Sequence, residues 1–112
     1  MSTRARIGVQ LERGEIKSVY VWRDGTPEVL GLTLAKHYGT PEMAAELVGR
    51  GNLIDVESTL EECNFERASG GGDIVPQIHK TFSAYLCERE DKDIRYKYIF
   101  RNGKWGYWRL GE

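Results

Sequence analysis

The segment from residue 95 to residue 110 constrains the fold most, because it predicts a β-hairpin of fixed register. It reads RYKYIFRNGKWGYWRL, two runs of alternating side chains separated by Asn102-Gly103. Asn-Gly is the preferred pair for a type I′ turn, since both of its residues take positive φ. A two-residue turn at this point determines which residues face each other across the hairpin. The predicted pairs are Arg101 with Lys104, Phe100 with Trp105, and Tyr98 with Tyr107.

The two faces of this predicted hairpin differ in chemistry. The first is aromatic enough to belong to a core, and it carries Tyr96, Tyr98, Phe100, Trp105, Tyr107 and Arg109. The second is basic with one large ring, and it carries Arg95, Lys97, Ile99, Arg101, Lys104, Trp108 and Leu110. Basic side chains often protect a solvated sheet from edge pairing. Alternatively, Trp108 stacks on a base while the cations bind phosphate. The sequence leaves both interpretations open.

A second hairpin is predicted near the N-terminus. Residues 5–11 and 16–22 each alternate between apolar and small or polar side chains, which indicates strands. Arg13-Gly14 lies between them as a predicted short turn, with Gly14 supplying positive φ. If that turn has two residues, Leu11 lies opposite Ile16 and Ile7 opposite Tyr20, on one buried face.

Helices are predicted between the two hairpins. Pro27 suits the first turn of a helix that reaches about residue 38, and Thr40 with Pro41 begins another, which ends at Gly49. Residues 81–89 predict a third helix, and Ser58 is a candidate cap for a short one. The predicted fold is therefore α+β, an antiparallel sheet of about four strands in two hairpins, with two to three helices packed on one face. The 112 residues suit a single domain, residues 1–112.

The charge of the chain limits its partners. A net charge of -1 argues against a protein that binds long nucleic acids, which carries an excess of bases. Acidic side chains dominate residues 42–73, whereas bases dominate residues 92–109. The acidic middle is either a partner surface or an ordinary solvated face. No apolar run is long enough to span a membrane, and no apolar signal region begins the chain, so we expect a cytoplasmic protein without membrane contact.

No catalytic or metal-binding pattern is apparent. Cys63 and Cys87 match neither zinc spacing nor a redox pair, and residues 70–72 are glycines without the lysine of a P-loop. His37 lies near a predicted helix end, where it suits the terminal carbonyls. His79 has no partner in the pattern. We therefore expect no enzyme activity, no cofactor and no metal.

Four segments resemble short proteins of tailed bacteriophages and prophages. They are the opening strand STRARIG from residue 2, SVYVWRDGTPE from residue 18, LAKHYGTPEMAAELVGRGNL from residue 34, and IFRNGKW in the closing hairpin. The positions that match the family pattern are Asp24, Gly25, Pro27, Glu28, His37 and Tyr38. The family usually has Cys-His-Trp before Asp-Gly and Tyr after it, where this chain has Val21, Trp22, Arg23 and Thr26. If that strand end contacts a ligand, the departure implies a different ligand here.

The resemblance implies a counter-defence protein, because small phage proteins of this build include factors that sequester nucleotide immune signals. We therefore expect a protein of the host cytoplasm that sequesters a small anionic, cyclic nucleotide without catalysis, as a homo-oligomer. The predicted ligand-binding residues are Arg95, Lys97, Arg101, Lys104, Trp108, Arg23, Trp22 and Asp24. The alternative is an inhibitor that covers a host immune or nucleic-acid-processing enzyme with its acidic middle surface.

Overall fold

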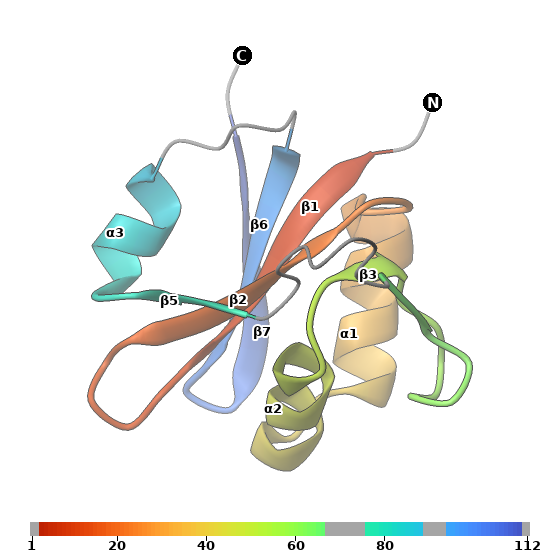
Figure 1. Ribbon diagram of the computed structural model, residues 1–112, viewed down its shortest axis with the longest axis horizontal. Coiled ribbons are helices and arrows are strands. Elements are labelled where there is room, and N and C mark those ends of the chain that lie inside the picture. The colour runs from red at the N-terminus through yellow and green to blue at the C-terminus, as the bar shows by residue number, and fades with distance from the viewer. Residues whose placement is uncertain (1–2, 67–75, 89–93, 111–112) are drawn as a thin grey trace, which may run out of the picture.

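The computed structural model describes residues 3–66, 76–88 and 94–110, and it shows one mixed β-sheet with helices on both sides (Figure 1). In these residues the sheet has seven strands, six of them in the order β4-β3-β2-β1-β6-β7, and β5 pairs with the first half of β2, from Ile16 to Ser18. The strands are β1 Arg4–Gln10, β2 Ile16–Val21, β3 Leu53–Asp55, β4 Asn64–Phe65, β5 Gln77–His79, β6 Ile94–Arg101 and β7 Lys104–Arg109. The α+β class is confirmed, whereas the count of about four strands is too low.

The sheet is not purely antiparallel as predicted. Strand β6 lies parallel to β1, with Ile7 beside Tyr98, and β3 lies parallel to the end of β2. The β1–β6 pair joins the two hairpins at the centre of the sheet. Hairpin signals report only strands that are adjacent in sequence, so the sequence carries no comparable signal for this parallel pair.

In the described part of the chain four helical elements flank the sheet: η1 Pro27–Gly31, a π-helical stretch that continues into α1 Leu32–His37, then α2 Pro41–Gly49 and α3 Phe82–Cys87. The predicted N-cap Thr40 is confirmed, since its hydroxyl accepts from the Met43 N–H at 3.2 Å. The candidate helix at Ser58 is wrong, because a turn there leads into β4. Among these helices, none is long and apolar enough to cross a membrane.

The helices divide between the two faces of the sheet. Helices α1 and α2 cover the main core, where Leu34 and Leu47 pack with Ile7 of β1. Helix α3 lies on the opposite side in Figure 1, and its Tyr85 packs against Ile16 and Ile99. The prediction that all helices pack on one face is therefore wrong.

The register of the first hairpin also differs from the prediction. Gln10 pairs with Ile16 and Ile7 pairs with Val19, because the strands are joined by five residues and not by a two-residue turn. Gly14 does take positive φ, at 89°. A shift of one residue moves every side chain of a strand to the other face. Ser18 and Tyr20 consequently lie on the α3 side of the sheet.

The closing hairpin forms as predicted. Arg101 pairs with Lys104, Phe100 with Trp105 and Tyr98 with Tyr107. Asn102 and Gly103 have φ of 55° and 82°, the values that a type I′ turn requires. Because the register is correct, the two faces of the hairpin carry the residues that the sequence assigned to them.

Candidate functional site

Residues of the closing hairpin line a hollow of about 170 Å³ on the α3 side of the sheet. Among them are Arg101, Lys104 and Trp108, and we refer to these three as the hairpin cluster. Strand alternation places all three on one face. Phe82 of α3 packs edge-on against Trp108, with ring centroids 5.1 Å apart. The indole is therefore partly covered from one side while it still borders the hollow.

Arg101 is held in place by aromatic rings. Its guanidinium carbon lies 3.7 Å from the centroid of the Phe82 ring and 6.0 Å from that of Trp108. Within the described ranges this guanidinium has no hydrogen bond or ion pair. A guanidinium has five N–H donors in a rigid fork that matches phosphate and carboxylate. Arg101 is thus a pre-oriented cation whose donors are available to an anion.

Lys97 has a different role from the one the sequence suggests. Its side chain is fully buried, and its ammonium donates to the carbonyl oxygens of Tyr85 at 2.5 Å and Glu88 at 3.1 Å. These carbonyls belong to the end of α3, where helical carbonyls have no partner within the helix and favour a cation. Lys97 therefore caps α3 and does not face the hollow.

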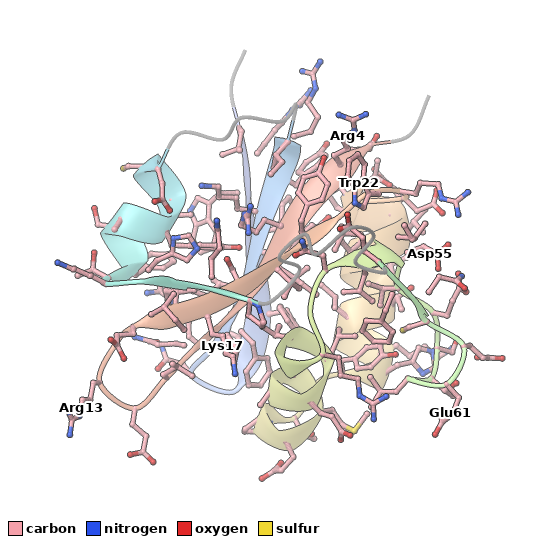
Figure 2. All side chains as sticks on the ribbon, viewed as in Figure 1. Arg4, Arg13, Lys17, Trp22, Asp55 and Glu61 are labelled. Atoms are coloured by element: carbon pink, nitrogen blue, oxygen red, sulfur yellow. The ribbon has the colours of Figure 1, made fainter. Side chains whose placement is uncertain are left out.

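The other predicted ligand residues lie outside the hairpin cluster. Arg95 is exposed on the same face, but six residues of extended strand, about 20 Å, separate it from Arg101. Figure 2 shows Trp22 beside Arg4 at the end of the sheet where β1 begins, and the Arg4 guanidinium lies 5.1 Å from the indole centroid. The Trp22 indole donates to Glu66 at 3.1 Å. The structure therefore does not bring these residues together into one site.

Arg23 and Asp24 follow Trp22 and have local roles. The exposed Arg23 guanidinium lies 3.5 Å from the carboxylate of Asp55, which is largely buried and also accepts from the Asn64 amide at 2.9 Å. Asp24 takes the left-handed conformation, with φ of 59°. Both residues are exposed beside the chain reversal that leads into η1.

Most of the positions on which the predicted resemblance rests have structural roles here. Pro27 begins η1, and Tyr98 donates to the carbonyl of Gly25 at 2.7 Å. Tyr38 is buried, donates to the carbonyl of Glu57 at 2.6 Å, and accepts at its own carbonyl from the Trp105 indole. Glu28 is exposed in the first turn of η1, and His37 lies in the last turn of α1. The contacts of Gly25 and Tyr38 and the place of Pro27 at the start of η1 therefore need no ligand to explain them.

A larger hollow of about 670 Å³ lies beside the same β6–β7 turn, and Arg101 of the hairpin cluster lines it as well. Its walls are mainly apolar, with Leu11 and Phe100 among them, and Glu12 adds an acidic group. An anion gains nothing from apolar walls and is repelled by a carboxylate. The smaller hollow has Lys104 beside Arg101 and no acidic side chain among the described residues that line it, so it is the better site for an anionic ligand.

Sequence reasoning missed a buried chain of hydrogen bonds on the α3 side. Ser18 Oγ lies 2.7 Å from His79 Nε2, and His79 Nδ1 lies 2.5 Å from a carboxylate oxygen of Glu88. Arg6 donates to the same serine oxygen at 3.3 Å. The three residues are distant in sequence, and only the corrected β1–β2 register turns Ser18 toward His79. No sequence spacing indicated this group.

The order serine, histidine, carboxylate resembles a nucleophile with its base, but its setting is structural. Ser18 has no exposed surface and His79 is 5% exposed. A nucleophile must reach a substrate, and this hydroxyl reaches only protein. These hydrogen bonds instead link β2, β5 and the end of α3.

Stability is expected to fall on acidification through His79. Burial, opposed by Glu88 and reinforced by Arg6 and Lys97, lowers the pKa of His79 below its usual 6.5. At pH values just below 6.5, the unfolded chain therefore binds more protons than the folded protein. The free energy of unfolding consequently decreases as the pH falls through this range. The decrease between pH 6.5 and 5.5 is at most about 1.4 kcal/mol, the limit for one proton.

Urea unfolding at several pH values measures this decrease in the free energy of unfolding. His79→Gln should flatten the plot of that free energy against pH between 6.5 and 5.5. An unchanged slope in that variant would contradict the assignment.

No family model, curated protein or solved structure matches this chain. The resemblance to phage proteins therefore stays a prediction from the sequence. The functional argument below depends on the geometry of the hairpin cluster.

Proposed function

We propose that the hairpin cluster binds a small anionic ligand that carries a planar ring, a nucleotide, and that the protein sequesters it without catalysis. The observation that carries this proposal is Arg101, stacked on Phe82 beside Lys104 and Trp108, with N–H donors that no described residue uses. An oriented guanidinium suits phosphate, and an aromatic edge beside it suits a base. The net charge of -1 favours such a local site over a long nucleic-acid surface.

The size of the hollow limits how much of a ligand it holds. Pockets for small molecules typically measure about 300–1,000 Å³, whereas this hollow measures about 170 Å³. It accommodates one phosphate with the ring beside it, and the rest of a nucleotide needs another wall. A homo-oligomer supplies that wall, which agrees with the expectation from the sequence.

In this proposal the protein acts in the cytoplasm of a bacterial host, where it removes a cyclic nucleotide signal of an immune system. The resemblance to phage proteins supports that role, and the hairpin cluster supplies its chemistry. Binding alone suffices for sequestration, so the proposal needs no catalytic group.

Calorimetric titration with cyclic di- and trinucleotides and ADP-ribose derivatives tests the proposal. For a ligand that binds, we expect Arg101→Ala to weaken affinity about 10- to 100-fold, since hydrogen bonds to a charged group contribute about 1.5–3 kcal/mol. Arg101→Lys should recover only part of this, because lysine keeps the charge but loses the fork and the ring contact.

Lys36→Ala provides the matched control for charge. It removes one exposed cation from α1, which packs on the other side of the sheet. Its affinity should stay within about twofold of the unchanged protein, as expected for a screened distant charge. Absence of heat with every compound, or equal losses in Arg101→Ala and Lys36→Ala, would remove the proposal.

A second candidate function uses the acidic middle of the chain. Glu57, Glu61 and Glu62 are all exposed, and Figure 2 shows Glu61 pointing away from the body of the protein. Such a surface suits a basic groove on a host enzyme. The same titrations separate the two candidates, because an inhibitor of this kind gives no heat with nucleotides and is unaffected by Arg101→Ala.

A further inference from the structure

Strand β7 has an open edge. It pairs with β6 on one side, and among the strands of the described ranges none pairs with its other side. Arg101 and Lys104 flank a two-residue turn, so they form a hydrogen-bonded pair. From Lys104 onward, the backbone N–H and C=O groups of successive β7 residues point alternately toward β6 and away from it. The N–H of Leu110 accordingly donates to Arg95 on β6 at 2.8 Å. The backbone groups that face outward are therefore those of Trp105, Tyr107 and Arg109.

This alternation restricts how β7 could pair with a second copy of itself. In an antiparallel pair, outward-facing residues must lie opposite outward-facing residues. A two-fold axis at Tyr107 satisfies this rule and uses the whole strand. The resulting pairs are Tyr107 with Tyr107, Gly106 with Trp108, Trp105 with Arg109, and Lys104 with Leu110.

The side chains suit this register. It places no cation directly opposite another cation, and like charges in that position destabilise a strand pair. It sets Arg109 against the aromatic Trp105, and it sets the large Trp108 against Gly106, which has no side chain. An axis at Gly106 also obeys the backbone rule, but it puts two glycines opposite each other and leaves the centre without side-chain contact.

Apolar surface lies next to the same edge. Tyr107 is 52% exposed, and Val29 in η1 and Leu32 in α1 are 48% and 66% exposed. Both η1 and α1 contact β7. Pairing at this edge therefore adds apolar burial to the backbone hydrogen bonds.

We propose that two copies of the chain pair antiparallel along β7, with Tyr107 on the two-fold axis. Such an axis is perpendicular to the sheet, so both hairpin clusters lie on the same side of the joined sheet. Lys104, Gly106 and Trp108 of β7 line the hollow. The β7 strand of the second copy extends that wall, which the small size of the hollow requires.

The symmetry of the pair also indicates which nucleotide would bind. This inference about the ligand depends on the proposed function, but the inference that two β7 strands pair does not. Two clusters related by a two-fold axis match a ligand with two phosphates and two bases, a cyclic dinucleotide. Its negative charge also offsets the cations that the pair brings together, so the ligand should strengthen pairing by mass action.

Cysteine cross-linking tests the register. Tyr107→Cys, made with Cys87→Ser to remove the exposed native thiol, places two cysteines in a hydrogen-bonded pair with Cα atoms about 5.5 Å apart, within disulfide range. Mild oxidation should give a covalent dimer on non-reducing gels. Arg109→Cys in the same background faces Trp105 of the other copy and should cross-link at least about tenfold more slowly. Equal rates, or no dimer from Tyr107→Cys, would overturn the proposal.

Sedimentation equilibrium with and without cyclic di-AMP keeps the two proposals distinguishable. Tyr107→Pro removes an N–H that faces outward and spares the β6–β7 ladder, so it should abolish the dimer. Heat of nucleotide binding by a protein that stays monomeric would overturn the pairing and leave the proposed function intact. A dimer that binds no nucleotide would support the pairing and count against the proposed function.

Discussion

Replacing Lys97 with alanine is expected to lower the free energy of unfolding by about 3–5 kcal/mol, because the buried Tyr85 carbonyl loses a donor, which costs about 1–3 kcal/mol, and a cavity adds to the loss. The ammonium of Lys97 donates to the carbonyls of Tyr85 and Glu88, and it lies 5.2 Å from the centroid of the Tyr85 ring. The side chain is fully buried. Urea unfolding followed by circular dichroism measures the loss.

Two further variants separate the causes of that loss. Lys97→Met keeps most of the volume but removes the donors, so it should lose about 1–3 kcal/mol. Lys36→Ala removes an exposed lysine of α1 and should stay within about 0.5 kcal/mol of the unchanged protein. If Lys97→Ala were as mild as Lys36→Ala, Lys97 would not stabilise the end of α3.

The closing hairpin was predictable because its information is local. Asn102-Gly103 selects the turn, and the turn sets every pair of β6 with β7. The same register placed Arg101, Lys104 and Trp108 on one face, so the centre of the candidate site follows from the sequence. The partner that orients Arg101 does not, because Phe82 comes from α3, whose side of the sheet the sequence leaves open.

The first hairpin was mispredicted because β2 is buried on both faces. Alternation identifies a face only when one side is solvated, and in β2 Ser18 and Tyr20 are as buried as Val19 and Val21. The same problem hid the role of Lys97. A lysine between Arg95 and Arg101 in an alternating strand indicates a solvated face, and only the position of α3 over that face turns it into a helix cap.

Gly25→Ala is the second substitution with a large expected effect, a loss of about 2–3 kcal/mol from steric strain in a packed site. A Cβ at Gly25 would lie 2.7 Å from Ala5 Cβ and 2.9 Å from the Thr3 carbonyl oxygen. The backbone cannot move aside easily, because the Gly25 N–H donates to Thr3 at 2.9 Å and its carbonyl accepts from Tyr98 at 2.7 Å.

Glycine is required at position 25 because a side chain has no room there. An Asp-Gly pair would instead suggest that the glycine is needed for its positive φ. In the pair it is Asp24 that takes positive φ, at 59°, and Gly25 that is buried.

Gly49 supplies the matched control, since a Cβ there has no neighbour within 4 Å. Gly49→Ala lies in α2 and should stabilise by about 0.5–1 kcal/mol, since alanine favours the helix. In thermal unfolding, the melting temperature should fall for Gly25→Ala and rise for Gly49→Ala. A shift of the same sign in both would show that the contact of Gly25 with Ala5 and Thr3 does not limit the side chain at that position.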